Sequence, residues 1–136
     1  MSRYVLDSFA VLADYWHEPG AARVRELRHD AVNLFWMSLI NVGEVFYRVA
    51  RTENRQAAAL LIAQLEQGGV TFIDTDRNLT FAAADLKTRF ALSYADCFAA
   101  ALAQRMDAAV VTGDREFEQL QRAGLIDIEW LTRARG

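Results

Sequence analysis

The stretch Ala109-Val110-Val111-Thr112-Gly113-Asp114 carries the pattern that decides the fold. A short apolar run without alternation ends in a glycine and an acidic residue. A strand with one face in water alternates apolar and polar side chains, so this run predicts a strand that is covered on both faces. Strands of that kind belong to parallel sheets that lie between layers of helices.

Similar runs recur along the chain and alternate with segments of helical spacing. The predicted strands are 4–6, 32–37, 70–73, 109–112 and, at a sheet edge, 126–131. The predicted helices are 8–16, 21–29, one capped by Ser38, 53–67, 77–90, one that starts at Ser93, and a short one before 123–124. This alternation predicts the α/β class, as a three-layer α/β/α sandwich with a mainly parallel five-stranded sheet. We expect one domain over residues 1–132 and a frayed tail over 133–136.

Composition limits the kind of protein that this chain can be. It has 136 residues, 53% of them hydrophobic, and a net charge of −3, which argues against a DNA-coating protein. No apolar run approaches the roughly 20 residues of a membrane span, and the N-terminal segment, with its acidic Asp7, does not read as a signal peptide. The single cysteine, Cys97, allows no internal disulfide and favours a cytoplasmic location. We expect Cys97 to be a small core residue.

Four acidic residues stand where the predicted sheet would bind a ligand. Open parallel sheets bind ligands beyond the carboxyl ends of their strands. Asp7 directly follows the first strand, and Asp114 follows the fourth by two residues. Glu44 lies in the helix after the second strand, and Asp96 lies in the first turn of the helix that precedes the fourth.

Each acid also has a purely structural explanation. Asp7, Asp76 and Asp114 could cap helices, and Asp96 could complete a capping box with Ser93. Glu44 fits a solvated helix face least well, because its neighbours at 42–46 are apolar or small.

Several carboxylates at one sheet edge would repel one another and raise each other's pKa, a conflict that a divalent cation removes. Oxygen ligands without Cys or His partners suit Mg²⁺ or Mn²⁺ better than zinc. The sequence contains neither a phosphate-cradling glycine loop nor the nucleophile elbow of a serine hydrolase.

Four segments in this order carry a resemblance to a known family. They are YVLDSFAVLADYWHEPGA (4–21), MSLINVGEVFYRV (37–49), LSYADCFAAALA (92–103) and VVTGDREF (110–117). Over about residues 4–131 the chain resembles the PIN-domain ribonucleases, and among them the VapC-type toxins of bacterial toxin–antitoxin pairs.

This resemblance implies a metal-dependent endoribonuclease that leaves 5′-phosphate and 3′-hydroxyl ends. It implies one or two Mg²⁺ or Mn²⁺ ions and a catalytic, metal-binding set of Asp7, Glu44, Asp96 and Asp114. Supporting positions are Thr112, Asn41, Ser8, Ser93 and Glu116, whereas Asp74 and Asp76 match no catalytic position. Candidates for holding RNA phosphates are Arg48, Arg51, Arg55, Lys87, Arg89 and Arg115.

The resemblance also implies partners. They are a cognate antitoxin protein, an RNA substrate of the transfer or ribosomal class, and a second copy of the chain in a homodimer. An antitoxin segment could lie in an apolar groove formed by Phe9, Leu12, Trp16, Phe46 and Val49, although core packing explains these residues equally well.

Three other functions stay open. The chain could be a PIN nuclease of RNA processing without an antitoxin, or a PIN fold kept only as a binding scaffold. A non-catalytic acidic-pocket module, such as a phospho-receiver domain, fits less well. That fold needs paired acids near the first strand and a Lys after the last, whereas Asp7 stands alone and the only Lys is Lys87.

Overall fold

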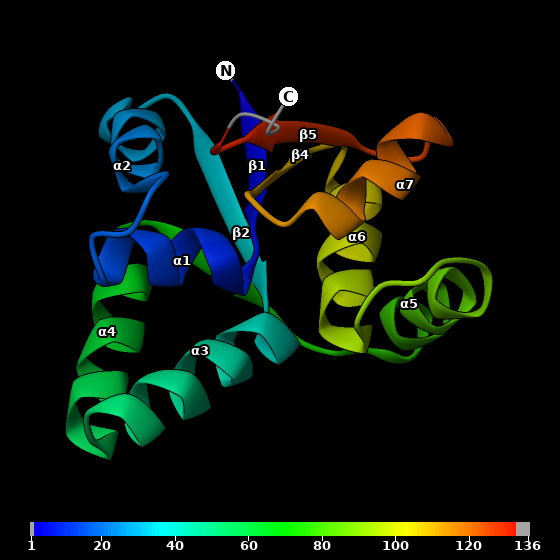
Figure 1. Ribbon diagram of the computed structural model, residues 1–136. Helices are drawn as coiled ribbons and strands as arrows, with labels where there is room; N and C mark the ends of the chain where they lie inside the picture. Colours follow the sequence, from blue (N-terminus) through cyan, green and yellow to red (C-terminus); the bar gives the residue numbers. More distant parts are fainter. Residues whose placement is uncertain (1, 133–136) are drawn as a thin grey trace.

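A parallel sheet of five strands forms the centre of the molecule (Figure 1). The computed structural model describes residues 2–132. The strands are β1 (Arg3–Leu6), β2 (Leu34–Ser38), β3 (Val70–Ile73), β4 (Ala109–Thr112) and β5 (Asp127–Trp130). Their order is β3-β2-β1-β4-β5, and every neighbouring pair is parallel. The sequence prediction of a mainly parallel five-stranded sheet is confirmed.

Helices cover both faces of this sheet, as the three-layer prediction requires (Figure 1). They are α1 (Ser8–Tyr15), α2 (Ala21–His29), α3 (Leu39–Thr52), α4 (Arg55–Gln67), α5 (Arg77–Arg89), α6 (Tyr94–Met106), the 3₁₀ helix η1 (Arg115–Phe117) and α7 (Glu118–Arg122). Helices α1 to α4 enclose one core with the sheet, and α5 to α7 enclose the other.

Successive strand residues supply the two cores in turn. Leu6 and Val111 pack beneath α1 to α4, whereas their neighbours Val5 and Val110 pack beneath α5 to α7. Fully burying such a side chain contributes about 1.5–3 kcal/mol, which explains why these strands read as continuous apolar runs. Cys97 is buried in the second core, as expected.

The element bounds differ from the sequence predictions only at their ends. The second strand begins at Leu34 and not at 32, because Asp30 accepts the backbone N–H of Val32 in a turn and leaves Val32 59% exposed. The helix predicted from 53 begins at Arg55, with Asn54 as its N-cap. The expectation of a frayed tail at 133–136 lies outside the described residues. No helix within residues 2–132 combines the length and the apolar character that a membrane crossing requires.

The strand order brings Asp7 and Asp114 to the same edge of the sheet. From the central β1 the chain moves outward to β2 and β3, then returns to β4 on the other side of β1. The gap between the carboxyl ends of β1 and β4 is the switch point at which open α/β sheets bind ligands. Leu6 pairs with Val111, so Asp7 lies beside Thr112, and Asp114 follows two residues later.

Candidate metal centre

Asp7 ends the central strand and begins α1. Its Oδ1 accepts the backbone N–H of Ala10 at 2.8 Å, which makes it the N-cap of the helix. The side chain is only 1% exposed. Burial raises the pKa of Asp7 from 3.8 to about 8, against hydrogen bonds from Thr112 and Ala10 and with help from the charges of Asp96 and Asp114. A buried carboxylate of this kind needs a positive partner to ionise at neutral pH.

Asp96 lies beside other acids, and its carboxyl also meets the hydroxyl of Ser93 at its own helix start, a hydrogen bond that lowers the pKa of Asp96. Ser93 caps α6 by accepting the backbone N–H of Asp96 at 3.2 Å, which is one half of a capping box. Within residues 2–132, the second bond of a capping box, from the Ser93 N–H to the Asp96 carboxylate, is not formed. Burial raises the pKa of Asp96 to about 7, and the charges of Asp114 and Glu44 add to the rise.

Asp114 and Glu116 reach the same place through the turn after β4. The Asp114 N–H donates to the Thr112 hydroxyl at 3.0 Å, and Asp114 Oδ1 accepts the Glu116 N–H at 2.9 Å. These bonds start η1 and bring Glu116 into the cluster. One carboxylate oxygen from each of Asp96, Asp114 and Glu116 lies within 4.8 Å of the others.

Gly113 allows this turn to approach α1 closely. A Cβ at this position would lie 2.4 Å from the ring of Phe9. Any other residue would therefore push the Phe9 ring out of its place beside the acids.

Glu44 reaches the same hollow from α3. The Ser8 hydroxyl donates a short hydrogen bond to Glu44 Oε1. The Glu44 side chain lines the same hollow of about 190 Å³ as the other acids. That hollow is lined by Asp7, Ser8, Phe9, Glu44, Arg48, Ser93, Asp96, Asp114 and Glu116.

The structure thus lines one hollow with the four predicted acids, Ser8, Ser93 and Glu116, and it places two supporting residues behind them. Asp7 and Glu44 line this hollow but are not in the group of Asp96, Asp114 and Glu116 whose carboxylate oxygens lie within 4.8 Å of one another. Thr112 is buried and holds Asp7 and the Asp114 backbone. Asn41 is fully buried, accepts the Ser38 hydroxyl at 2.7 Å and donates to the Ala95 carbonyl at 3.2 Å. Asn41 therefore ties α3 to the first turn of α6 and positions the neighbouring Asp96.

The donor set fits a hard divalent cation. All candidate ligands are carboxylate oxygens, with hydroxyl groups beside them, and no His or Cys lines the hollow. Mg²⁺ and Mn²⁺ prefer such oxygen ligands. Burial, and to a lesser extent the charges of the neighbouring acids, raises the pKa values of Asp7 and Asp96, and a bound cation would offset both effects.

Five of the six predicted phosphate-binding cations separate into two groups, and the sixth, Arg55, is exposed at the start of α4. Arg48 lines the acidic hollow, and Arg51 lies one turn further along α3. Arg89 instead pairs with Asp85 at 3.0 Å, Arg115 donates to the Thr132 carbonyl, and Lys87 donates to the Leu92 carbonyl at 2.6 Å. The sequence could not make this distinction for Lys87 and Arg115, whose partners are carbonyls of folded loops. Arg89 and Arg48 each follow an acid by four residues, and only the fold shows that Asp85 pairs with Arg89 whereas Glu44 accepts from Ser8.

A comparison with protein families places this geometry in a known class. The model of the PIN domain family matches residues 4–123. The chain belongs to the PIN domain family. No curated protein matches the chain.

Solved structures share the fold of this PIN domain at low sequence identity. VapC20 of Mycobacterium tuberculosis, described as a sarcin–ricin loop cleaving toxin, is 18% identical, with a TM-score of 0.73, over 93% of this chain and 98% of its own. VapBC-1 of nontypeable Haemophilus influenzae is 19% identical, with a TM-score of 0.72, over 96% and 99%. VapBC2 of Rickettsia felis, bound to a promoter DNA fragment, is 20% identical, with a TM-score of 0.68, over 93% and 97%.

Outside the cluster, one acid of this PIN domain shows what a structural carboxylate looks like. Asp76 caps α5 by accepting the Leu79 N–H at 2.8 Å and pairs with both terminal nitrogens of Arg105 at 2.8 and 2.9 Å. The Arg105 guanidinium, with the helix N–H groups, lowers the pKa of Asp76 to about 2. Its predicted role as a cap residue is confirmed.

Two of the predicted groove residues belong to the core. Leu12 and Val49 are 3% and 0% exposed, so neither offers a surface to a partner. Core packing is therefore the correct explanation for this pair. Phe9, at 36% exposed, keeps an accessible ring beside the acids.

Proposed function

We propose that this PIN domain is a metal-dependent endoribonuclease and the toxin of a toxin–antitoxin pair. The observation that carries the proposal is the convergence of Asp7, Glu44, Asp96 and Asp114 on one hollow at the switch point of the sheet. Structural likeness to VapC20, a toxin described as cleaving the sarcin–ricin loop, and to VapBC complexes supports the choice of RNA and of an antitoxin.

The residues divide the work of the proposed reaction. Asp7, Asp96, Asp114 and Glu44 hold one or two Mg²⁺ or Mn²⁺ ions, with Glu116 as a further ligand. When bound, such ions lower the pKa of water and stabilise the charge that develops on a phosphate. Ser8 orients Glu44 by its hydrogen bond, Thr112 orients Asp7, and Asn41 fixes the start of α6.

The proposal extends to the substrate and the partners. The substrate is a transfer or ribosomal RNA, cleaved in the cytoplasm to 5′-phosphate and 3′-hydroxyl ends. The active toxin is a homodimer, and a cognate antitoxin blocks the acidic hollow. Exposed Phe9 beside the acids gives an inhibitory segment an apolar contact at the edge of the site.

The test is cleavage of total cellular RNA by purified protein. We expect cleavage with Mg²⁺ or Mn²⁺ and none in excess chelator. Asp96→Asn should reduce the rate by about a hundredfold or more, since the lost ligand contributes several kcal/mol to charge stabilisation. Asp76→Asn is the matched control, because Asp76 is also an acid at the start of a helix but lies outside the hollow.

Two results would contradict the proposal. Cleavage that persists in chelator would exclude the metal role, and an Asp96→Asn protein with unchanged activity would exclude the site. Mapping of 5′ ends in RNA from cells that express the protein would then identify the cleaved loop. Co-purification of a small protein expressed from the neighbouring gene would test the antitoxin.

A further inference from the structure

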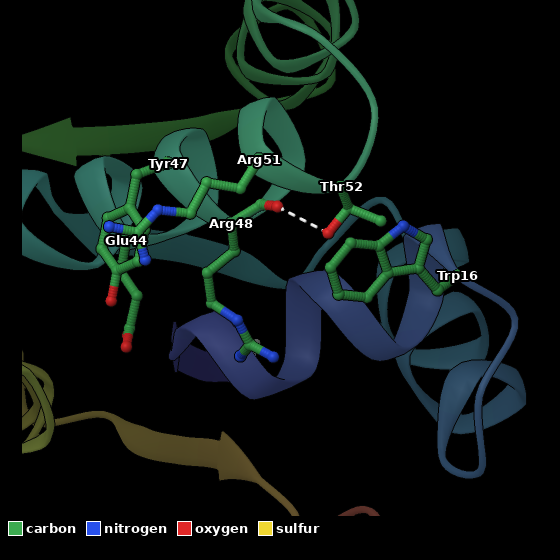
Figure 2. A pocket seen from close by; sticks show the side chains of 6 residues that line it. All are labelled: Trp16, Glu44, Tyr47, Arg48, Arg51 and Thr52. Carbon is green, nitrogen blue, oxygen red and sulfur yellow. Dashed lines mark hydrogen bonds between the residues drawn. The ribbon is translucent and has the colours of Figure 1, made fainter.

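A second hollow adjoins the acidic one along α3. It has a volume of about 650 Å³ and lies between the end of α1 and the last turns of α3 (Figure 2). The residues that line it are Trp16, Glu44, Tyr47, Arg48, Arg51 and Thr52. We call this surface the α1–α3 groove. Its lining combines two aromatic rings and two guanidinium groups with one carboxylate, whereas carboxylates predominate in the acidic hollow.

Two arginines of the groove contact aromatic rings but, within residues 2–132, no acidic side chain. Arg51 lies over the Tyr47 ring at 5.0 Å, and Arg48 lies over the Trp16 ring at 5.8 Å. Among the described residues, neither guanidinium takes part in an ion pair or a hydrogen bond; the contact drawn in Figure 2 joins the Thr52 hydroxyl to the Arg48 carbonyl. The N–H donors of both guanidiniums are therefore free for a ligand.

The Tyr47 ring is exposed, and the Trp16 ring is half-buried. Tyr47 is 44% exposed, although an aromatic ring of its size is usually covered. Figure 2 shows the Trp16 ring turned toward the side chains of α3. A ring beside a guanidinium without an acidic partner matches a nucleotide, because a base can stack on the ring while the phosphate binds the cation.

The groove continues into the acidic hollow. Glu44 and Arg48 line both, so a chain lying in the groove would pass directly to the carboxylates. We propose that the α1–α3 groove is a subsite for single-stranded RNA, in which Tyr47 and Trp16 stack bases and Arg48 and Arg51 bind the phosphates next to the cleaved bond. This inference rests on the proposed nuclease function, and it assigns residues for holding substrate and not for the chemistry.

A short fluorescein-labelled single-stranded oligoribonucleotide tests the subsite by fluorescence anisotropy. Binding is measured in chelator over a range of salt concentrations, so that no cleavage interferes. Tyr47→Leu should weaken binding at least about fivefold, the low end of the loss of one stacked base. Arg51→Gln should reduce the slope of log affinity against log salt by about 0.7, the value for one phosphate contact on a single strand.

A matched pair on another helix controls for lost charge and lost aromatic surface. Arg77 lies over the Phe81 ring at 5.2 Å on α5, and Phe81 is 62% exposed, but neither residue lines the groove or the acidic hollow. The double variant Arg77→Gln/Phe81→Leu should bind like the wild type. Thermal melting followed by circular dichroism checks that each variant is folded, which the exposure of all these side chains favours.

Steady-state cleavage with Mg²⁺ provides the second readout. If the groove holds substrate, the loss in Tyr47→Leu and Arg51→Gln falls on KM. Wild-type protein that binds the oligoribonucleotide through these residues but cleaves nothing would support the subsite and contradict the nuclease proposal. Cleavage with unchanged KM and unchanged binding in both variants would overturn the subsite alone. Binding of a glutamate-rich peptide in place of RNA would also overturn it, because the groove would then belong to a protein partner.

Discussion

Replacing Asp7 by Asn should stabilise the metal-free protein at neutral pH. Asn keeps a side-chain oxygen for the 2.8 Å cap on Ala10, so helix α1 retains its N-cap. Asn cannot ionise, so the variant loses the penalty that the fold places on the charged carboxylate. The pKa of Asp7 rises from 3.8 to about 8 on folding, mainly through burial.

The sign and size of the effect follow from this shift. Below pH 3.8 the carboxyl is protonated in both states, and folding gains or loses nothing from it. As the pH rises toward 8, the unfolded chain releases the proton while the folded chain keeps it, so the free energy of unfolding falls. Between the unfolded pKa of 3.8 and pH 7 lie about 3 pH units, and each unit costs 1.36 kcal/mol of stability. The loss in the free energy of unfolding at pH 7 is therefore at most about 4 kcal/mol.

Urea unfolding in chelator, between pH 4 and pH 8, measures the difference between the two proteins. At pH 4 the free energies of unfolding should agree, and the Asp7→Asn protein should become progressively more stable toward pH 7. Added Mg²⁺ or Mn²⁺ should stabilise the wild type more than the variant, because the ion binds the folded carboxylates. Asp76→Asn should instead lower the free energy of unfolding relative to the wild type at these pH values. The lowered pKa of Asp76 means that its charge supports the fold above pH 3.8 and ceases to do so as the pH falls toward 2.

A wild type that is as stable as Asp7→Asn at pH 7 in chelator would refute this reasoning. It would show that Asp7 ionises in the fold at no cost, satisfied by Thr112 and Ala10 alone. The site would then lack the electrostatic conflict that we assign to it. Asp7→Ala is a weaker probe, because it also removes the cap and costs about 1 kcal/mol for that reason.

Two further predictions follow from the same contacts. Mn²⁺ affinity, measured by titration calorimetry, should rise from pH 6 to pH 8, and binding should release protons. Asp7 and Asp96 have pKa values of about 8 and 7 and must lose their protons to bind the ion. An affinity that does not change with pH would contradict this prediction. Asn41→Ala should lower the free energy of unfolding by about 1–3 kcal/mol in urea and slow RNA cleavage, since it leaves the Ala95 carbonyl without its donor beside Asp96; a stable, fully active variant would show that Asn41 positions nothing.

Local patterns were sufficient to predict the fold and to place Asp7 and Asp114 at one edge of the sheet, whereas the choice of all four acids as a metal-binding set rests on the family resemblance. The apolar run at 109–112 and its counterparts define every strand, and acids directly after strands meet wherever a sheet is parallel. Contacts that depend on the tertiary structure could not be predicted from the sequence. Glu116 joins Asp96 only because the Asp114 side chain holds the 3₁₀ turn of η1, and no periodic signal marks that turn. The arginines could not be ranked either, since Arg89 and Arg48 look alike in sequence and differ only in whether a folded neighbour occupies the guanidinium.

Capping and metal binding are not alternatives at the acids of this site. Asp7 and Asp76 each accept a backbone N–H three residues on, at 2.8 Å, yet their pKa values lie near 8 and near 2. The capping bond is the same, so it cannot decide the role of the carboxylate. The surroundings decide it, because Asp76 meets a guanidinium in solvent whereas Asp7 is buried beside other acids. Ser93 and Asp96 show the same relation. The Ser93 cap fixes the first turn of α6, and the Asp96 carboxylate in that turn lies near Asp114. A helix start at a strand end positions an acid rigidly, and rigid convergence of acids is what a cation requires.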